Sequence, residues 1–269
     1  MTEITIATLN VGAASEKRGR RLLDDWILRS SYDVYVFSET SDSAGTALIK
    51  SCFQAGGWSV FQRLGVGDRG VTVATRIKSK EINQFPFEGM LRSRSVVADL
   101  DVVPRLEIIA LYVPNRGNDR TKIERKRHFL DASLRYLSET RNPNISRIIV
   151  GDLNVVPVSQ RPVFLPQFPF EDEWYERLQS VAGFYDAAVG HYCGHESTWV
   201  AHTGEGYTYD HILPDESLRG RVVQFRYDHG PRISTSVTDH SAVTLTVRLD
   251  SVQYLHTNPP SELKQMSWF

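Results

Sequence analysis

The chain has 269 residues, a hydrophobic content of 41% and a formal net charge of −1. It can bury one large core, and its charge is not that of a strongly basic nucleic-acid-binding domain. The sequence has no apolar run of membrane-spanning length, no signal peptide and only two cysteines, Cys52 and Cys193. These features predict a cytoplasmic protein that does not insert into membranes.

The N-terminal segment predicts strands and helices in alternation. The expected elements, in chain order, are a strand at 5–9, a helix beginning near Ser15 and Glu16, a strand at 34–37, a helix at 44–55 and a strand at 58–61. Asn10 follows the first strand and Glu39 follows the second. An acid at a strand end either lies exposed in water or coordinates a hard cation through oxygen, the ligand type that Mg²⁺ prefers.

The next segment predicts three strands, at 71–74, 96–100 and 106–112. The run from Gly65 to Gly70 fits G-x-G-x-x-G, but an apolar strand follows it, whereas a dinucleotide site requires a helix there. We therefore interpret this run as a hairpin loop. Tyr112-Val113-Pro114-Asn115 ends the long strand that begins at Leu106 and places a phenol and an amide at another strand end.

The central segment predicts a helix at 121–139, a strand at 147–150 and a helix at 172–181. Gly151-Asp152-Leu153-Asn154 follows the strand. Asp152 and Asn154 are two residues apart on an extended segment, so both can reach one ligand. The carboxylate could orient a water or bind a cation, and the amide could donate to a phosphoryl oxygen. The alternative is an Asx turn that closes the strand.

The C-terminal segment predicts strands at 222–225 and 242–249. Asp210 begins another apolar run, and Asp239-His240 precedes the last strand. These residues are either ordinary strand-end groups or a carboxylate–imidazole set that contacts a phosphate or a metal. We expect a domain at 1–250 and an appended tail at 251–269 that either docks or stays mobile.

Hairpin-like strand pairs occur together with strand–helix–strand units. This mixture predicts an α/β fold with two packed mixed sheets and helices on their outer faces, rather than a purely parallel doubly wound sheet.

Taken together, these strand-end residues resemble the endonuclease/exonuclease/phosphatase superfamily, and most closely the exonuclease III-type abasic-site endonucleases. The resemblance runs from about residue 4 to residue 249. Its most specific motifs are Tyr112-Val113-Pro114-Asn115, Gly151-Asp152-Leu153-Asn154 and Thr238-Asp239-His240. The family fold that it implies, a four-layer α/β sandwich, agrees with the expected elements.

The resemblance also implies roles for individual residues. Glu39 would be the principal Mg²⁺ ligand, with Mn²⁺ as an alternative metal, and Asn10 and Asp239 would lie close to the cation. Asp152 would activate water or stabilise the leaving oxygen, and the phosphate would be held by Asn154, Tyr112 and Asn115. Asp210 would align His240, and His240 would face the phosphate. A pocket for a base-free sugar would be lined by Trp199 and Tyr207.

The implied function is a metal-dependent hydrolase of DNA phosphodiester bonds, acting as an abasic-site endonuclease, a 3′-exonuclease or both in DNA repair. Nothing in the sequence demands more than a monomer. Gly12 and Ser41 depart from the family pattern, because close relatives often carry an acid or amide and a lysine there. Two alternatives stay open. The near-neutral charge motivates a phosphatase or phosphodiesterase for a small-molecule or lipid phosphoester, and Gly12 and Ser41 motivate a catalytically silent binding module.

Overall fold

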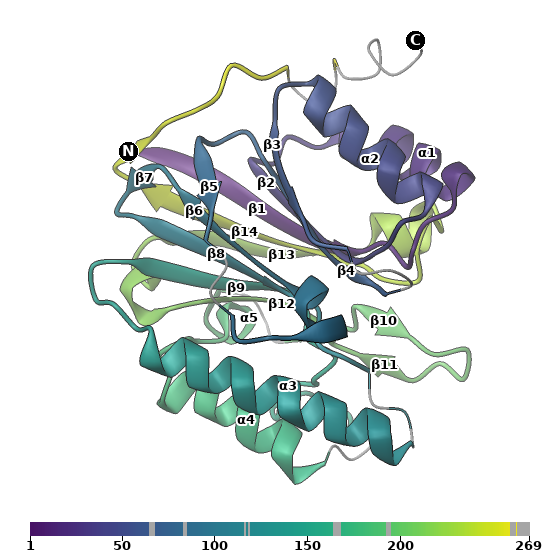
Figure 1. Ribbon diagram of the computed structural model, residues 1–269, viewed down its shortest axis with the longest axis vertical. Coiled ribbons are helices and arrows are strands. Elements are labelled where there is room, and N and C mark those ends of the chain that lie inside the picture. The colour runs from purple at the N-terminus through teal and green to yellow at the C-terminus, as the bar shows by residue number, and fades with distance from the viewer. Residues whose placement is uncertain are drawn as a thin grey trace.

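The computed structural model describes residues 1–64, 68–82, 85–115, 117, 119–163, 168–191, 195–258 and 262. Two mixed β-sheets pack face to face, and each carries helices on its outer face (Figure 1). The four-layer α/β sandwich expected from the sequence is confirmed. Part of the predicted hairpin loop, residues 65–67, lies outside the described residues, but the strands on either side of it pair antiparallel as expected.

The first sheet has the strand order β13-β14-β1-β2-β4-β3. Its strands are β1 (Thr2–Asn10), β2 (Val34–Thr40), β3 (Ser59–Gln62), β4 (Gly70–Thr75), β13 (Val222–Asp228) and β14 (Ala242–Leu249). Only the β1–β2 pairing in this sheet is parallel. The helices on its outer face are α1 (Glu16–Asp25) and α2 (Ala44–Ala55) (Figure 1).

The second sheet has the order β12-β9-β8-β6-β5. Its strands are β5 (Ser79–Glu81), β6 (Ser95–Leu100), β8 (Leu106–Leu111), β9 (Ser146–Asp152) and β12 (Asp210–Pro214). Strands β8 and β9 are parallel, and the other pairings are antiparallel. Helices α3 (Arg120–Glu139) and α4 (Pro169–Ser180) cover its outer face (Figure 1).

Several shorter elements complete the fold. Two small ribbons pair β10 (Trp199–Val200) with β11 (Gly206–Tyr207) and β7 (Val102–Val103) with β15 (Ser251–Val252). The short helical segments are α5 (Ala187–His191), η1 (Ile27–Arg29), η2 (Gly89–Arg94), η3 (Glu216–Leu218) and η4 (Gly230–Ser234). Strands of two or three residues carry too few side chains for periodicity to reveal them, so these ribbons are not predictable from the sequence.

Residues 251–258 run from β7, in the connection between β6 and β8 of the second sheet, to the end of α2 beside the first sheet. Tyr254 forms a bridge with Ile77, and the amide of Asn258 donates to the carbonyl of Gly56 over 3.0 Å. The indole of Trp58 donates back to the carbonyl of Asn258 over 3.1 Å. Residues 251–258 are therefore held against the rest of the chain by these contacts.

Alternating side chains explain why the sheets have two buried faces. Along β2, Val34 and Val36 enter the cluster between the two sheets, whereas Tyr35 and Phe37 pack beneath α1 and α2. Successive side chains of a strand point to opposite faces, so a continuous apolar run marks a strand covered on both sides. A third cluster lies under α3 and α4 and contains Phe129 among others.

The helix starts follow local capping chemistry. The hydroxyl of Ser15 accepts the amide of Arg18, which confirms the expected start of α1. Helix α4 starts at Pro169, three residues before the predicted start, because proline suits the first helical turn. The Glu171 carboxylate also accepts the amide of Phe168 over 2.8 Å, which caps the helix there.

Gly151 allows β9 to pass close to β8. Its φ is +139°, and a Cβ added there would lie 2.0 Å from the carbonyl oxygen of Leu111. We expect Gly151→Ala to lower the free energy of unfolding by on the order of 3 kcal/mol, because both the backbone strain and the overlap must be relieved. Chemical denaturation measures this loss. Gly220→Ala, which meets no atom within 4 Å, is the control and should change stability little.

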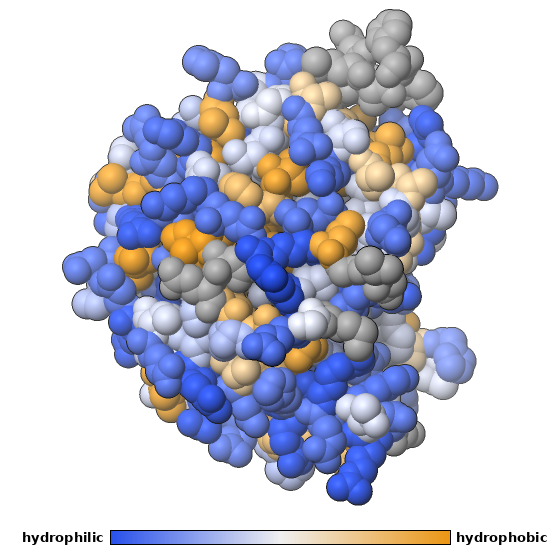
Figure 2. Space-filling model, viewed as in Figure 1, coloured by the Kyte–Doolittle hydropathy of each residue, from blue (hydrophilic) through white to orange (hydrophobic). Residues whose placement is uncertain are grey.

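The outer surface is mostly polar on the face shown in Figure 2, where apolar residues form small separate patches. No helix among the described residues is long and apolar enough to cross a membrane.

Candidate active site

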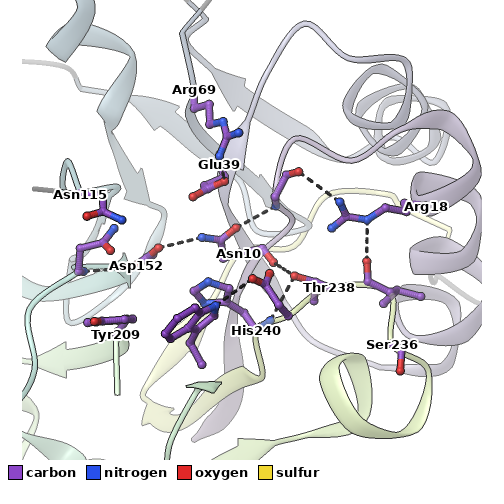
Figure 3. A pocket seen from close by; sticks show the side chains of 15 residues that line it. Asn10, Arg18, Glu39, Arg69, Asn115, Asp152, Tyr209, Ser236, Thr238 and His240 are labelled. Atoms are coloured by element: carbon purple, nitrogen blue, oxygen red, sulfur yellow. Dashed lines mark hydrogen bonds and ion pairs between the residues drawn. The ribbon is translucent and has the colours of Figure 1, made fainter. Parts of the chain in front are cut away.

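A cleft of about 680 Å³ opens where β1, β2 and β9 end (Figure 3). Loops from both sheets meet there, so residues that are far apart in the sequence share one wall. The described residues that line it are Asn10, Gly12, Arg18, Glu39, Arg69, Asn115, Asp152, Asn154, Trp199, Tyr209, Ser236, Val237, Thr238, Asp239 and His240.

The structure brings together most of the residues singled out from the sequence. Eight of them line the cleft: Asn10, Glu39, Asn115, Asp152, Asn154, Trp199, Asp239 and His240. The other three adjoin it. Tyr112 donates to Glu39, Asp210 pairs with His240, and the Tyr207 ring lies 6.0 Å from that of Trp199.

Asp152 is the buried carboxylate of the cleft, with 1% of its surface exposed. Its two oxygens accept hydrogen bonds from the Asn10 amide nitrogen over 2.8 Å and from the Asn154 backbone amide over 2.9 Å. The register of β12 against β9 places Asp210 directly opposite Asp152. Burial, with the charge of Asp210 added, raises the pKa of Asp152 to about 7. A carboxyl group whose pKa lies near 7 can exchange a proton at physiological pH.

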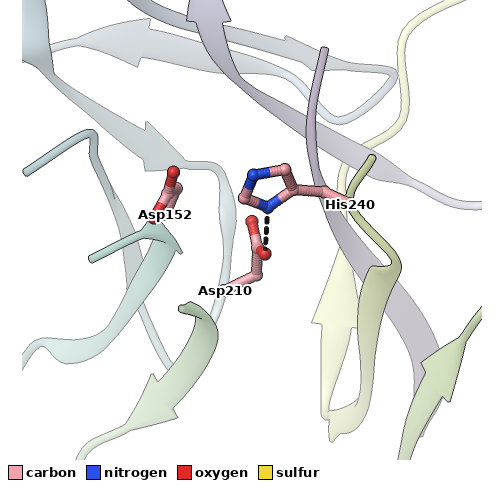
Figure 4. A group of neighbouring side chains, drawn as sticks. All are labelled: Asp152, Asp210 and His240. Carbon is pink, nitrogen blue, oxygen red and sulfur yellow. Dashed lines mark hydrogen bonds and ion pairs between the residues drawn. The ribbon is translucent and has the colours of Figure 1, made fainter. Parts of the chain in front are cut away.

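Asp210 and His240 form a hydrogen-bonded pair (Figure 4). Nδ1 of His240 donates to Oδ2 of Asp210 over 2.7 Å. Burial opposes the charged imidazolium, but the carboxylates of Asp210, Asp152 and Asp239 outweigh it and raise the pKa of His240 to about 9. His240 is therefore cationic at neutral pH and presents its other ring nitrogen as a donor.

The titration of His240 gives a testable consequence. Its folded-state pKa lies above the ordinary value of 6.5, so this interaction stabilises the fold fully below about pH 6.5 and is lost as pH rises through about 9. We expect the His240 ring signals of metal-free protein to titrate near pH 9 in NMR spectra. In Asp210→Asn the midpoint should fall toward 6.5, and an unchanged midpoint would contradict the assigned cause.

Glu39, the second-last residue of β2, has a left-handed conformation, with φ at +56°. Non-glycine residues adopt this region at an energetic cost that functional sites often carry. The Tyr112 hydroxyl donates to Oε1 of Glu39 over 2.8 Å, and the Arg69 guanidinium forms an ion pair with Oε2. Burial, together with the charges of Glu39 and Asp152, raises the pKa of Tyr112, so the phenol stays protonated and acts as a donor.

Asn154 is also left-handed, with φ at +47°. Two contacts fix it: its side-chain nitrogen donates to the Val113 carbonyl over 3.0 Å, and its own carbonyl accepts from Nζ of Lys126 over 2.6 Å. Lys126 also forms a buried ion pair with Glu171 of α4. The sequence gives no sign that Lys126 is buried, since a lysine on a predicted helix is usually expected on its solvated face. The structure instead buries it behind the Asp152–Asn154 segment.

Hydrogen bonds fix two further side-chain amides of the cleft. Oδ1 of Asn10 accepts the Gly12 amide over 2.8 Å, which fixes the amide nitrogen toward Asp152. Oδ1 of Asn115 accepts the Gly117 amide over 3.1 Å. That bond leaves the Asn115 amide nitrogen to serve as a donor in the cleft.

An aromatic wall closes one side of the cleft. The Trp199 indole donates to Asp239 over 2.8 Å, and Trp199 lies opposite Tyr207 in the β10–β11 ribbon. Of the described residues, Tyr209 rather than Tyr207 lines the cleft, and the two tyrosine rings stack 5.4 Å apart. The sequence signal for Tyr209 was its i, i+2 spacing from Tyr207, which places both rings on one face of an extended segment.

Two cleft arginines were not identified from the sequence. Arg18 from α1 donates to the carbonyls of Val11, Gly12 and Val237, so it ties the loops around the cleft together. Arg69 pairs with Glu39. No local pattern marks either residue, because their partners come from other segments of the chain.

The donor set fits a divalent cation. Its oxygens come from Glu39, Asp152, Asp210 and Asp239, and Oδ1 of Asp210 is buried with no hydrogen-bond partner among the described residues. Ligand atoms of Asp152, Asp210 and His240 lie within 4.8 Å of one another, although His240 and Asp210 already bind each other. Carboxylate and amide oxygens are the ligands that Mg²⁺ prefers. Burial and the charge of Asp210 raise the pKa of Asp152, and a nearby cation would offset both effects.

Two packed mixed sheets with a carboxylate- and imidazole-lined cleft at their strand ends define the class, an α/β-sandwich hydrolase. The chain belongs to the endonuclease/exonuclease/phosphatase family, whose sequence model matches residues 7–240. The resemblance drawn from the strand-end motifs is therefore confirmed. A comparison with curated proteins found no match.

Solved structures share the fold. An AP endonuclease from Archaeoglobus fulgidus has a TM-score of 0.74 at 20% identity, with 92% of this chain and 100% of that chain covered. The 3′ phosphatase NExo from Neisseria, bound to a product DNA hairpin, gives 0.75 at 19% identity, with 92% and 100% covered. The AP endonuclease LMAP from Leishmania major gives 0.71 at 17% identity, with 91% and 88% covered.

Proposed function

We propose that this protein is a Mg²⁺-dependent phosphodiesterase that acts on DNA, as an abasic-site endonuclease, a 3′-exonuclease or both. The observation that carries the proposal is the convergence of Glu39, Asp152, Asn154 and the Asp210–His240 pair in one cleft. A protein that only binds a partner does not require this combination of hard oxygen ligands, a carboxylate with a pKa near 7 and a buried imidazolium.

Each residue has a role that its contacts allow. Glu39 and Asn10 would hold the cation with Asp239 nearby, and the cation would supply charge neutralisation at a phosphoryl oxygen. Asp152 takes the proton of the attacking water, as its raised pKa permits. His240, held by Asp210, donates to the phosphoryl oxygen that gains charge.

The remaining cleft residues position the substrate. The amides of Asn115 and Asn154 face the phosphate, and Tyr112 holds Glu39 in place. The wall of Trp199 and Tyr209, with Tyr207 stacked on Tyr209, offers flat apolar surface to a deoxyribose that has lost its base. Two of the structural neighbours bear the name AP endonuclease and one contains a DNA hairpin, which supports DNA as the substrate.

A substrate panel with and without chelator tests this function. The panel contains a duplex with one abasic site, a 3′-recessed duplex, inositol phosphates and phospholipid head-group esters. We expect Mg²⁺-dependent, chelator-sensitive cleavage of the DNA substrates. The net charge of −1 motivates the small-molecule arm, and hydrolysis confined to that arm would overturn the DNA assignment. Inactivity on every substrate would favour a silent binding module.

A further inference from the structure

Arg69 forms an ion pair with Glu39, the carboxylate that the proposed function assigns to the metal. Its guanidinium lies beside Glu39 (Figure 3) and pairs with Oε2, while the Tyr112 hydroxyl donates to Oε1, so both carboxylate oxygens have partners. The two groups differ in exposure: the side chain of Glu39 is 17% exposed and that of Arg69 is 51% exposed. Glu39 thus sits in the wall, and Arg69 reaches it from the solvent side.

The backbone of Arg69 is anchored although its side chain is exposed. Its amide donates to Oδ1 of Asp68 over 2.8 Å. The Asp68 carboxylate is buried, and it accepts from Ser93 over 2.9 Å and from Arg94 over 3.1 Å. Because the backbone is held and the guanidinium is half exposed, the Arg69 side chain can move while its Cα atom stays beside the cleft.

These contacts form a closed path around the carboxylate. The Arg94 guanidinium lies over the Tyr112 ring, 4.5 Å from its centroid, and Tyr112 donates to Glu39. The path runs from Glu39 through Arg69, Asp68 and Arg94 to Tyr112 and back to Glu39. Arg69 is its most exposed charged member, so its ion pair with Glu39 is the contact that solvent ions can most easily replace.

A guanidinium and a divalent cation compete for the same oxygen. Arginine offers only donors and keeps its charge, and the charge of Glu39 raises the pKa of Arg69 further. A cation on Oε2 would meet the guanidinium at close range, and the resulting repulsion would move Arg69 off the carboxylate. The released guanidinium lines the cleft, where a phosphate can accept two of its hydrogen bonds.

We propose that Arg69 is an exchangeable counter-ion of Glu39, which a divalent cation displaces and which then binds a phosphate of the substrate. This inference rests on the proposed function, because it takes Glu39 as a metal ligand. In the metal-free protein the Arg69 side chain pairs with Glu39, and in the metal-loaded protein it moves to bind the substrate phosphate.

Calorimetric titration of metal-free protein with Mg²⁺ tests the exchange independently of catalysis. Because its competitor is gone, Arg69→Ala should bind Mg²⁺ about threefold to tenfold more tightly than the wild type. Arg69→Lys keeps a single positive charge without the planar fork and should fall between the two. Arg63→Ala is the matched control, since Arg63 lies in the same β3–β4 hairpin but pairs with Glu81, and its affinity should equal that of the wild type.

Steady-state kinetics at saturating Mg²⁺ supply the opposite readout. Arg69→Ala should raise KM for a DNA substrate about threefold to tenfold with kcat little changed. Loss of a merely structural contact would weaken metal binding and substrate binding together. Mg²⁺ affinity in Arg69→Ala that is equal to or weaker than that of the wild type would overturn the exchange.

Glu39→Gln separates failure of this inference from failure of the proposed function. Unchanged Mg²⁺ affinity in Glu39→Gln would show that the cation does not bind Glu39, and both proposals would fall. If Glu39→Gln loses Mg²⁺ binding and Arg69→Ala binds like the wild type, the metal assignment stands and only the counter-ion exchange is overturned.

Discussion

Replacing Asp152 with asparagine should slow phosphodiester hydrolysis by about 10²- to 10⁴-fold, the range that positioned acid–base groups contribute. Asparagine has nearly the same size but cannot take a proton from water. The buried position and the opposed Asp210 charge give Asp152 a pKa of about 7, so the wild-type carboxylate exchanges a proton near neutral pH. Single-turnover kinetics on an abasic duplex measure the loss in the chemical step.

The same substitution should leave the fold intact. Asp152 has a folded-state pKa above its ordinary value of 3.8, so ionising it costs stability in the metal-free protein as pH rises from about 4 to 7. Removing that charge offsets the loss of one accepted hydrogen bond, and circular dichroism at pH 8 should show a native spectrum. Asp131→Asn, on the exposed face of α3, is the control and should retain full activity. Near wild-type turnover in Asp152→Asn would remove Asp152 from the mechanism.

Replacing His240 with alanine should lower kcat by about 10²- to 10³-fold, as expected for a donor that stabilises developing negative charge. The pKa of about 9 keeps the imidazolium charged at neutral pH, and Asp210 fixes its orientation. The loss should appear mainly in kcat, because the charge on the phosphoryl oxygen grows in the transition state.

Alanine at position 240 also leaves the buried Asp210 carboxylate without its partner, which destabilises the fold. His240→Gln serves as a second variant, since it keeps a neutral donor near Asp210. Both variants should be slow, and His128→Ala, on the exposed side of α3, should not. If His240→Gln folded normally and cleaved DNA at the wild-type rate, the role of His240 would be refuted.

Local patterns predicted much of the scaffold. Among the strands of four or more residues, continuous apolar runs identified every one except β12. The apolar run after Asp210 marked β12. The helix at 44–55 has the predicted bounds because Ser43 caps its start and Gly56-Gly57 ends it. The polar residues at strand ends could also be recognised in the sequence, because a carboxylate or amide that follows an apolar run is a local feature of the chain.

Tertiary structure decided how these parts act on one another. The register of β12 on β9 sets Asp210 opposite Asp152, and this long-range pairing raises the carboxylate pKa to about 7. Lys126 and Arg69 looked like surface charges or loop residues, yet one is buried under Asn154 and the other binds Glu39. Charge interactions depend on distance and burial, which a linear sequence does not contain. The longer strands and helices, and the polar residues at the strand ends, follow from neighbours along the chain, and so the sequence determined them by itself.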